Sequence, residues 1–268
     1  MTPENLTDPD HTMTHYAAYP SLNDCPVVIS GGASGIGEAM VRAFAGQGAK
    51  VGFVDIAEDA GNALAAELNE SGHTVHFIAC DVTDISAYQA AIAECAERHG
   101  DALVLVNNAA HDQRHQWNEV TPEEWDQRMA VNLKHAFFAI QAVASGMAKA
   151  GRGSIINYGS ISWMIMAPGI PVYETAKAAT HGLTRAMARE LGQSGIRVNS
   201  LVPGAVMTQR QRELWVTAAD LANIKQQQAI PEAISPEDCA RMALFLAADD
   251  SAMITGQQFL VDAGWANG

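Results

Sequence analysis

Short apolar runs alternate with longer, alanine-rich amphipathic stretches along most of the chain. Most of the apolar runs are apolar on both faces, as strands are when helices cover both sides of a parallel sheet. The alternation therefore predicts an α/β fold, in which a doubly wound parallel β-sheet carries helices on both faces. The expected strands are 27–30, 50–55, 74–80, 103–107, 154–158, 197–201 and 258–261. The expected helices are 37–47, 57–70, 85–99, 122–150, 173–192 and 236–248.

The same pattern predicts one domain preceded by a short arm. Residues 1–20 are polar, contain prolines and lack apolar periodicity, so we expect them to form a flexible N-terminal arm. Residues 21–268 contain neither an internal repeat nor a linker, which predicts a single domain over that range.

Charge and composition exclude several classes of partner. The formal net charge of −14 argues against nucleic acid and against anionic membranes, because both are bound mainly through lysine and arginine. No apolar run is long enough to cross a bilayer and no signal segment opens the sequence, so we expect a cytoplasmic protein. The cysteines and histidines show no CxxC or HExxH spacing, which predicts no metal site.

A glycine-rich turn, SGGASGIG, occupies residues 30–37 between the first expected strand and the first expected helix. Glycines permit a tight turn and the close approach of backbone N–H groups to a pyrophosphate, and the positive end of the following helix faces the phosphates. This position predicts a Rossmann-like dinucleotide site, although glycines of this kind also occur in loops that need positive φ angles. The expected cofactor contacts are Gly31, Ser34, Gly35, Ile36 and Gly37.

The second expected strand ends at Asp55, where a carboxylate can accept hydrogen bonds from the adenosine ribose. A carboxylate repels a 2′-phosphate, and the next residues, Ile56 and Ala57, provide no arginine to bind one. The sequence therefore favours NAD over NADP. The alternative interpretation is a carboxylate that only ends the strand or caps the next helix.

Tyr173 and Lys177 are four residues apart in an expected helix, so they share one helical face. A phenol with a pKa near 10 is a poor base at neutral pH, and a neighbouring ammonium favours the phenolate. The pair can therefore transfer a proton. The alternative is a solvated tyrosine beside a surface lysine.

Further motifs occur in the same chain and in a fixed order. Besides the glycine turn and the Tyr-Lys pair, they are Asp81-Val82, the segment Asn107-Asn108-Ala109-Ala110, Asn132, Ser160 and Pro203-Gly204. With these motifs, the chain resembles the short-chain dehydrogenases/reductases from about residue 21 to the C-terminus. Two positions depart from the family pattern: Ser30 stands where threonine is usual, and Ala110 where glycine is usual.

The resemblance implies a catalytic set of Asn132, Ser160, Tyr173 and Lys177. Tyr173 would exchange a proton with the substrate oxygen, and Ser160 would position that oxygen by a hydrogen bond. Lys177 would lower the pKa of the tyrosine and bind the nicotinamide ribose, while Asn132 would hold a water that connects Lys177 to solvent. Hydride would pass between the substrate carbon and the nicotinamide.

The resemblance also implies further cofactor contacts along the cleft. It assigns Asp81 to the adenine side, Asn108 and Ala109 to the central region, and Val206 and Thr208 to the carboxamide end. Tyr173 and Lys177 belong to this set too, and its remaining members are Ile56, Val82, Pro203 and Gly204.

The loop at 111–117 follows an expected strand at the carboxyl edge of the sheet and is polar, which suits a polyhydroxylated substrate better than a lipid. Segments 157–163, 173–178 and 262–265 look like the branch of the family that oxidises aldoses at C1. That resemblance implies an aldose substrate, NAD as cofactor and a sugar lactone as product. The expected substrate residues are Asp112, Arg114, His115, Ser160, Trp163, Tyr173 and Arg210, and Trp215 is expected on a lid.

Alternatives remain open for these assignments. Arg114, His115 and Arg210 are also compatible with surface or inter-subunit salt bridges, and Trp163 with core packing. The alternative functions are reduction of a ketone, such as a 3-oxoacyl or steroid substrate, and a catalytically idle NAD sensor. Family likeness and alanine-rich helix faces around Ala139 and Ala178 predict a homotetramer.

Overall fold

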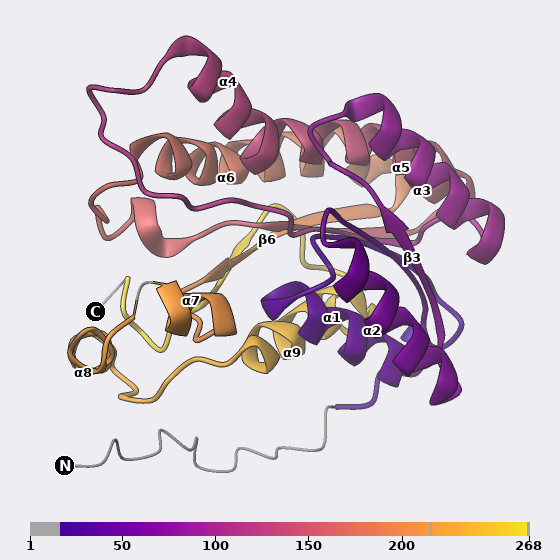
Figure 1. The fold of residues 1–268 in the computed structure, drawn as a ribbon. Helices are drawn as coiled ribbons and strands as arrows, with labels where there is room; N and C mark the ends of the chain where they lie inside the picture. The colour runs from indigo at the N-terminus through magenta and orange to yellow at the C-terminus, as the bar shows by residue number, and fades with distance from the viewer. Residues whose placement is uncertain (1–16, 215, 267–268) are drawn as a thin grey trace.

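The computed structural model describes residues 17–214 and 216–266, and residues 1–16 of the expected arm lie outside the described residues. In the described part of the chain, parallel strands form one seven-stranded sheet in the order β3-β2-β1-β4-β5-β6-β7 (Figure 1). The strands are β1 (Pro26–Ser30), β2 (Lys50–Asp55), β3 (Thr74–Ala79), β4 (Val104–Asn107), β5 (Gly153–Tyr158), β6 (Ile196–Pro203) and β7 (Gln258–Val261).

Helices cover both faces of the sheet, which confirms the predicted doubly wound architecture. On one face lie α1 (Gly35–Gly46), α2 (Glu58–Glu70) and α9 (Pro236–Ala247). On the other face lie α3 (Ile85–His99), α4 (Pro122–Met129), α5 (His135–Ala150) and α6 (Pro171–Leu191). Two shorter helices, α7 (Gln209–Leu214) and α8 (Ala218–Gln227), follow β6.

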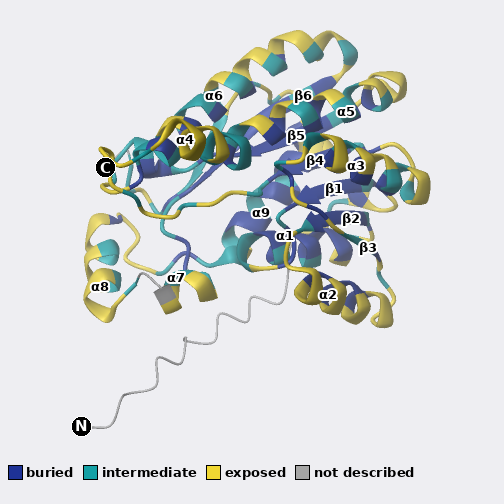
Figure 2. Cartoon of the chain, turned by 45° about the horizontal axis from the view of Figure 1, so that its top comes forward, coloured by how far each residue is buried: buried dark blue, intermediate teal, exposed yellow. Residues whose placement is uncertain are grey.

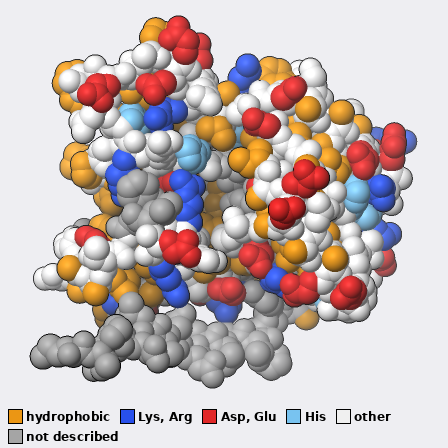
Figure 3. Space-filling view, in the orientation of Figure 1, with side chains coloured by type: hydrophobic (Ala, Val, Ile, Leu, Met, Phe, Trp, Pro, Cys, Tyr) orange, Lys and Arg blue, Asp and Glu red, His pale blue; other side chains and the backbone are white. Residues whose placement is uncertain are grey.

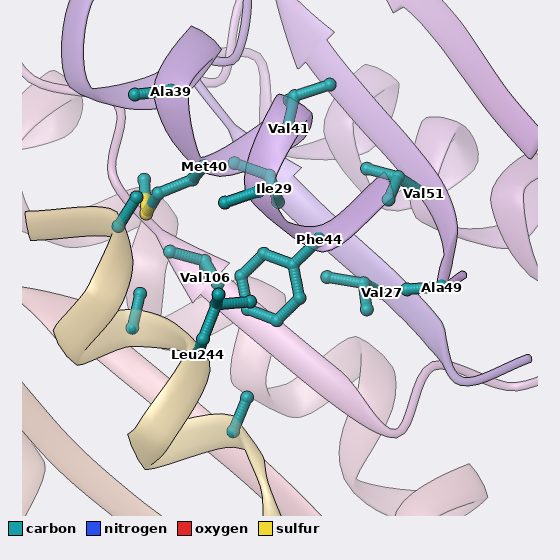
Figure 4. Close-up of a cluster of buried hydrophobic side chains, with 14 of the residues drawn as sticks. Val27, Ile29, Ala39, Met40, Val41, Phe44, Ala49, Val51, Val106 and Leu244 are labelled. Carbon is teal, nitrogen blue, oxygen red and sulfur yellow. The ribbon is translucent and has the colours of Figure 1, made fainter. Parts of the chain in front are cut away.

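Residues of β1 alternate between the two apolar layers, because successive side chains of a strand point to opposite faces. Val27 and Ile29 pack with α1 and α9, whereas Val28 packs with α3 and α5. Figure 4 shows the buried ring of Phe44 (α1) lying between Leu244 (α9) and Val27. The inner strands β1, β2, β4, β5 and β6 are therefore buried on both faces, while the outer surfaces of the helices are exposed (Figure 2).

The strand order places a crevice at the carboxyl edge of the sheet. The chain runs outward from β1 to β2 and β3, and outward in the opposite direction from β4 to β5, β6 and β7. The loops after β1 and β4 therefore diverge, and ligands of open α/β sheets bind where this reversal occurs. The motifs at 31–37, 108–112 and 160–163 all follow strands that end at this edge.

Two stretches differ from the sequence prediction. The expected helix 122–150 consists of α4 and α5 joined by a π-helical segment, Ala130–Lys134. The stretch 209–227, where we expected no helix, contains α7 and α8. Helices α7 and α8 are both short, so their apolar periodicity is a weak signal of helix. The boundary of α8 is nevertheless specified locally, since Thr217 and Asp220 form a capping box.

The end of the expected arm contacts the domain. The Tyr19 N–H donates to Gln47 Oε1 at 2.8 Å, and Gln47 Nε2 donates to the Ala17 carbonyl at 2.9 Å. Acidic side chains are spread over the face shown in Figure 3, with basic side chains among them. Within the described residues, no helix combines the length and the apolarity needed to span a membrane. All four cysteines are buried free thiols.

Candidate active site

The glycine turn between β1 and α1 is packed tightly against the loop that follows β4. Gly31 and Gly35 have φ angles of 68° and 56°, in the left-handed region that favours glycine. A Cβ on Gly31 would lie 2.9 Å from the Cα of Ala109, and a Cβ on Gly37 would overlap the carbonyl oxygen of Gly31. The glycines are therefore required both by backbone conformation and by close packing around the start of α1.

Ser30 joins this turn to the same neighbouring loop. Its hydroxyl accepts hydrogen bonds from the N–H groups of Asn108 (3.1 Å) and Ala109 (3.2 Å). The Asn108 side chain donates in return to the carbonyls of Ser30 (3.1 Å) and Gly31 (2.9 Å). The serine that replaces the usual threonine thus keeps the hydroxyl in a structural role, fixing two loops that line the crevice.

Asp55 lies at the end of β2 with its carboxylate held by the backbone. One oxygen accepts from the Ala33 N–H and the other from the Ala57 N–H, both at 3.0 Å. The carboxylate is therefore held in place at the mouth of the crevice beside the glycine turn. Each oxygen retains a second lone pair, so the same group can still accept from a ribose hydroxyl.

The expected cofactor residues come together around a cleft of about 1350 Å³. Its walls are the glycine turn, the ends of β2, β3 and β4, and the start of α7. The residues of the expected set that line it are Gly31, Ser34, Gly35, Ile36, Gly37, Asp55, Ile56, Asp81, Val82, Asn108, Ala109 and Thr208. Five members of the expected set are not among the lining residues: Tyr173, Lys177, Pro203, Gly204 and Val206. Val206 is buried and bridged to Ile234. This cleft suits an extended dinucleotide, because the glycine turn lies between Asp55, which accepts from Ala33, and Thr208, whose side chain lies beside Gly35.

Ser160, Tyr173 and Lys177 lie together between the end of β5 and the first turns of α6. The hydroxyls of Ser160 and Tyr173 interact, and this interaction lowers the pKa of Tyr173. Burial has the larger effect and raises that pKa above its usual value, and the charge of Asp112 raises it further. The expected lowering of this pKa by Lys177 is therefore not found: the pKa is raised, and the group that lowers it is Ser160.

Lys177 is a buried lysine with a fixed orientation. Its side chain is 3% exposed, its Nζ donates to the Tyr158 carbonyl at 2.8 Å, and its Nζ lies 5.6 Å from the centroid of the Tyr173 ring. Burial lowers the pKa of Lys177 to about 8, and Asp112 opposes that change. This ammonium can therefore lose its proton at mildly alkaline pH, within reach of the tyrosine.

Asn132 lies in the π-helical segment between α4 and α5, and its carboxamide binds backbone groups. Its Oδ1 accepts from the His111 N–H at 2.8 Å, and its Nδ2 donates to the carbonyls of His111 (3.1 Å) and Arg128 (2.9 Å). The π-helical turn thus places a side chain that clamps the loop after β4, in line with the frequent occurrence of such turns at functional sites. Both donors of the carboxamide are used in this clamp, whereas Oδ1 retains a second lone pair to which a bound water can donate.

Sequence reasoning missed His135, which begins α5. It is 2% exposed, and its Nε2 lies 3.1 Å from the carbonyl oxygen of Ala109 in the cofactor cleft. Burial lowers its pKa to about 3, with the charge of Lys177 acting in the same direction, so the ring is neutral and supports Ala109 from behind. The available signal was its spacing of three residues from Asn132, which places both side chains on one helical face.

The expected substrate residues on the loop after β4 take different positions. Asp112 accepts from Gln211 Nε2 at 3.0 Å and pairs with Arg210 Nη2 at 3.5 Å. His115 contacts the start of α6: its N–H donates to the Gly169 carbonyl at 2.8 Å, and its Nε2 accepts from the Val172 N–H at 3.4 Å. The loop is therefore fastened to α6 at one point and to α7 at another.

The remaining expected substrate residues lie on the opposite side of the site or at its rim. Trp163 follows Ser160 directly after β5, and its indole N–H is buried without a hydrogen-bond partner. Arg114 is exposed beside Gly169. Trp215 lies outside the described residues.

Comparison with known proteins agrees with this geometry. A family model described as enoyl-(acyl carrier protein) reductase matches residues 31–266. A D-xylose 1-dehydrogenase of Caulobacter vibrioides is 48% identical over 93% of this chain and 98% of its own length. A probable galactose dehydrogenase of Rhizobium meliloti is 44% identical over 92% of this chain and 96% of its own. A blue fluorescent protein from a metagenomic library, solved in complex with NADPH, has a TM-score of 0.85 and 31% identity, covering 92% of this chain and 99% of that protein.

The fold, the cleft and these relatives show that the chain belongs to the short-chain dehydrogenase/reductase family. It is a nicotinamide-dependent dehydrogenase that acts on CH–OH groups.

Proposed function

We propose that this enzyme oxidises the anomeric carbon of an aldose with NAD and releases a sugar lactone. The observation that carries the proposal is the likeness, over more than nine-tenths of the chain, to enzymes named for galactose and xylose. The polar loop at 111–117 beside Tyr173 supports it, because a sugar offers several hydroxyls to such groups.

The reaction follows from the positions of three side chains. Tyr173 in its phenolate form accepts the proton of the C1 hydroxyl, while the Ser160 hydroxyl donates a hydrogen bond to the same oxygen. The C1 hydrogen leaves as a hydride, for which NAD is the acceptor when bound. A C=O bond forms at C1, and the proton left on Tyr173 returns to solvent past Lys177. Trp163 would lie against the sugar ring.

Within the cofactor cleft, we propose a preference for NAD over NADP. Asp55 places a carboxylate where the adenosine ribose would bind. Arg42, a nearby cation of the cleft, is paired with Glu38 at 2.9 Å and with Glu67 through two bonds of 2.6 and 2.8 Å. A 2′-phosphate would therefore meet a negative charge and an arginine that is already neutralised.

Asp55→Ala should reduce the ratio of kcat/KM for NAD to that for NADP by about 10- to 100-fold, the effect of losing hydrogen bonds to a charged group. Steady-state kinetics with both cofactors measure this ratio. Asp59→Ala, which removes an exposed carboxylate from the first turn of α2, is the matched control and should leave the ratio unchanged. An unchanged ratio in Asp55→Ala would refute the assignment.

A substrate panel tests the proposed reaction. NADH should form with one or more pentoses, hexoses or 6-deoxyhexoses, and NADH should not be consumed with acetoacetyl or steroid ketones. Turnover of the ketones alone would replace the proposal with a reductase. Thermal stabilisation by NAD without turnover of any alcohol would instead indicate a cofactor sensor.

We also propose that the enzyme is a cytoplasmic homotetramer. The expectation that Ala139 lies on a helix face that contacts a partner is wrong, because Ala139 is 0% exposed in the core of its own chain. Ala178 on α6 remains partly exposed, and Phe137 on α5 is 44% exposed, so these two helices still offer a small-residue and apolar face.

A further inference from the structure

Asp112 connects two segments that are far apart in the sequence. It lies on the loop after β4, and its two partners, Arg210 and Gln211, lie on α7. The hydrogen bond from Gln211 is 3.0 Å long and the ion pair with Arg210 is 3.5 Å. Asp112 thus joins α7 to the other wall of the cofactor cleft, which both segments line.

The loop that carries Asp112 is anchored on both sides. His111 is clamped by the Asn132 carboxamide, and His115 is bonded to Gly169 and Val172 at the start of α6. By contrast, α7 spans only Gln209–Leu214 and packs lightly on the other described elements. The loop after β4 is therefore the fixed partner in this contact, and α7 is the segment that Asp112 holds in place. We call α7 the lid helix.

The Asp112 carboxylate also acts on the reacting groups. Its negative charge raises the pKa of both Tyr173 and Lys177. The other groups facing this region are Ser160, which lowers the pKa of Tyr173, and His111, whose pKa is lowered by burial, by Arg210 and by Arg128. His135 faces Lys177 from behind and is kept neutral by burial. The charge on Asp112, which pairs with Arg210 on the lid helix, therefore changes the pKa of both groups at the site of proton transfer.

We propose that Asp112 is a positioning residue that fastens the lid helix α7 across the cofactor cleft and couples lid closure to the charge around the reacting oxygen. The coupling to proton transfer rests on the proposed function, whereas the fastening of the lid concerns cofactor binding alone. Displacement of Arg210 and Gln211 from Asp112 would open one wall of the cleft and leave the carboxylate uncompensated.

The test uses Asp112→Asn and Arg210→Gln, with Glu119→Gln as the control. Glu119 is an exposed carboxylate farther along the same loop, so its replacement makes the same change in net charge as Asp112→Asn. Calorimetric titration with NAD, which needs no substrate, should show Kd raised about 3- to 10-fold in both lid variants and unchanged in the control. Unchanged NAD affinity in both variants would overturn the fastening role, whether or not the enzyme oxidises sugars.

The pH dependence of kcat for sugar oxidation tests the coupling. Oxidation needs the phenolate of Tyr173, and Asp112 raises the pKa of that group, so Asp112→Asn should move the acidic limb of the profile to lower pH. Arg210→Gln leaves the Asp112 charge uncompensated and should not move the limb downward. A profile of Asp112→Asn that superimposes on the wild type, or the same downward shift in both variants, would overturn the coupling.

Discussion

Tyr173→Phe is expected to reduce kcat for sugar oxidation by about 10²- to 10⁴-fold, which is the contribution of proton transfer by a positioned side chain. The ring itself is retained, so packing at the start of α6 is unchanged. The Kd for NAD should therefore stay within about two-fold of wild type, since a single neutral hydrogen bond contributes little. Stopped assays of NADH formation and NAD titration measure the two quantities.

Tyr158→Phe is the matched control for this variant. Tyr158 is a buried tyrosine whose hydroxyl contacts the sulfur of Met40 at 3.0 Å, within the core on the α1 side of the sheet. Its contact with Lys177 is made by the backbone carbonyl, which accepts a hydrogen bond from Lys177 Nζ, and not by the hydroxyl. Tyr158→Phe should keep kcat near wild type, and a kcat for Tyr173→Phe within ten-fold of wild type would remove the assigned role.

Lys177→Met should lower kcat/KM by about 10²-fold or more and should also make the protein more stable at pH 7. The pKa of Lys177 is lowered from 10.5 to about 8 by burial, and each unit of such a shift corresponds to about 1.4 kcal/mol. Removing this buried ammonium should therefore raise the free energy of unfolding by up to about 3 kcal/mol, less the hydrogen bond to Tyr158. Activity and stability would change in opposite directions, as expected for a strained functional group.

The pH dependence of that stability difference follows from the direction of the shift. Between pH 8 and 10.5 the unfolded chain binds more protons than the folded chain at this lysine, so the wild type gains stability as pH rises. The advantage of Lys177→Met should accordingly shrink over that window. Urea unfolding at several pH values measures it, with exposed Lys149→Met as the control. A variant no more stable than wild type at pH 7 would contradict the account.

Much of the architecture could be predicted from the sequence because its signals are local and repeated. The alternation of apolar runs and amphipathic stretches specified the parallel sheet, and the glycines between β1 and α1 marked the crevice. Ser160, Tyr173 and Lys177 then come together for a topological reason, since the carboxyl end of β5 and the start of α6 lie at one edge of the sheet.

Other features depend on contacts that no local pattern reveals. The π-helical turn at Ala130–Lys134 is continuous with helices on both sides, so apolar periodicity cannot distinguish it. The pairing of Asp112 with Arg210 joins residues far apart in the chain and depends on where α7 folds. The neutral state of His135 and the low pKa of Lys177 follow from burial, which is a property of the folded chain.

Isotope transfer from C1 tests the central claim most directly. The aldose that gives the most NADH in the panel is supplied with deuterium at C1, and the cofactor and sugar products are analysed by mass spectrometry. Direct hydride transfer from the anomeric carbon predicts that the reduced cofactor carries one deuterium and that an unlabelled lactone forms in equal amount. Deuterium retained at C1 of the sugar product, with unlabelled NADH, would contradict the proposed reaction.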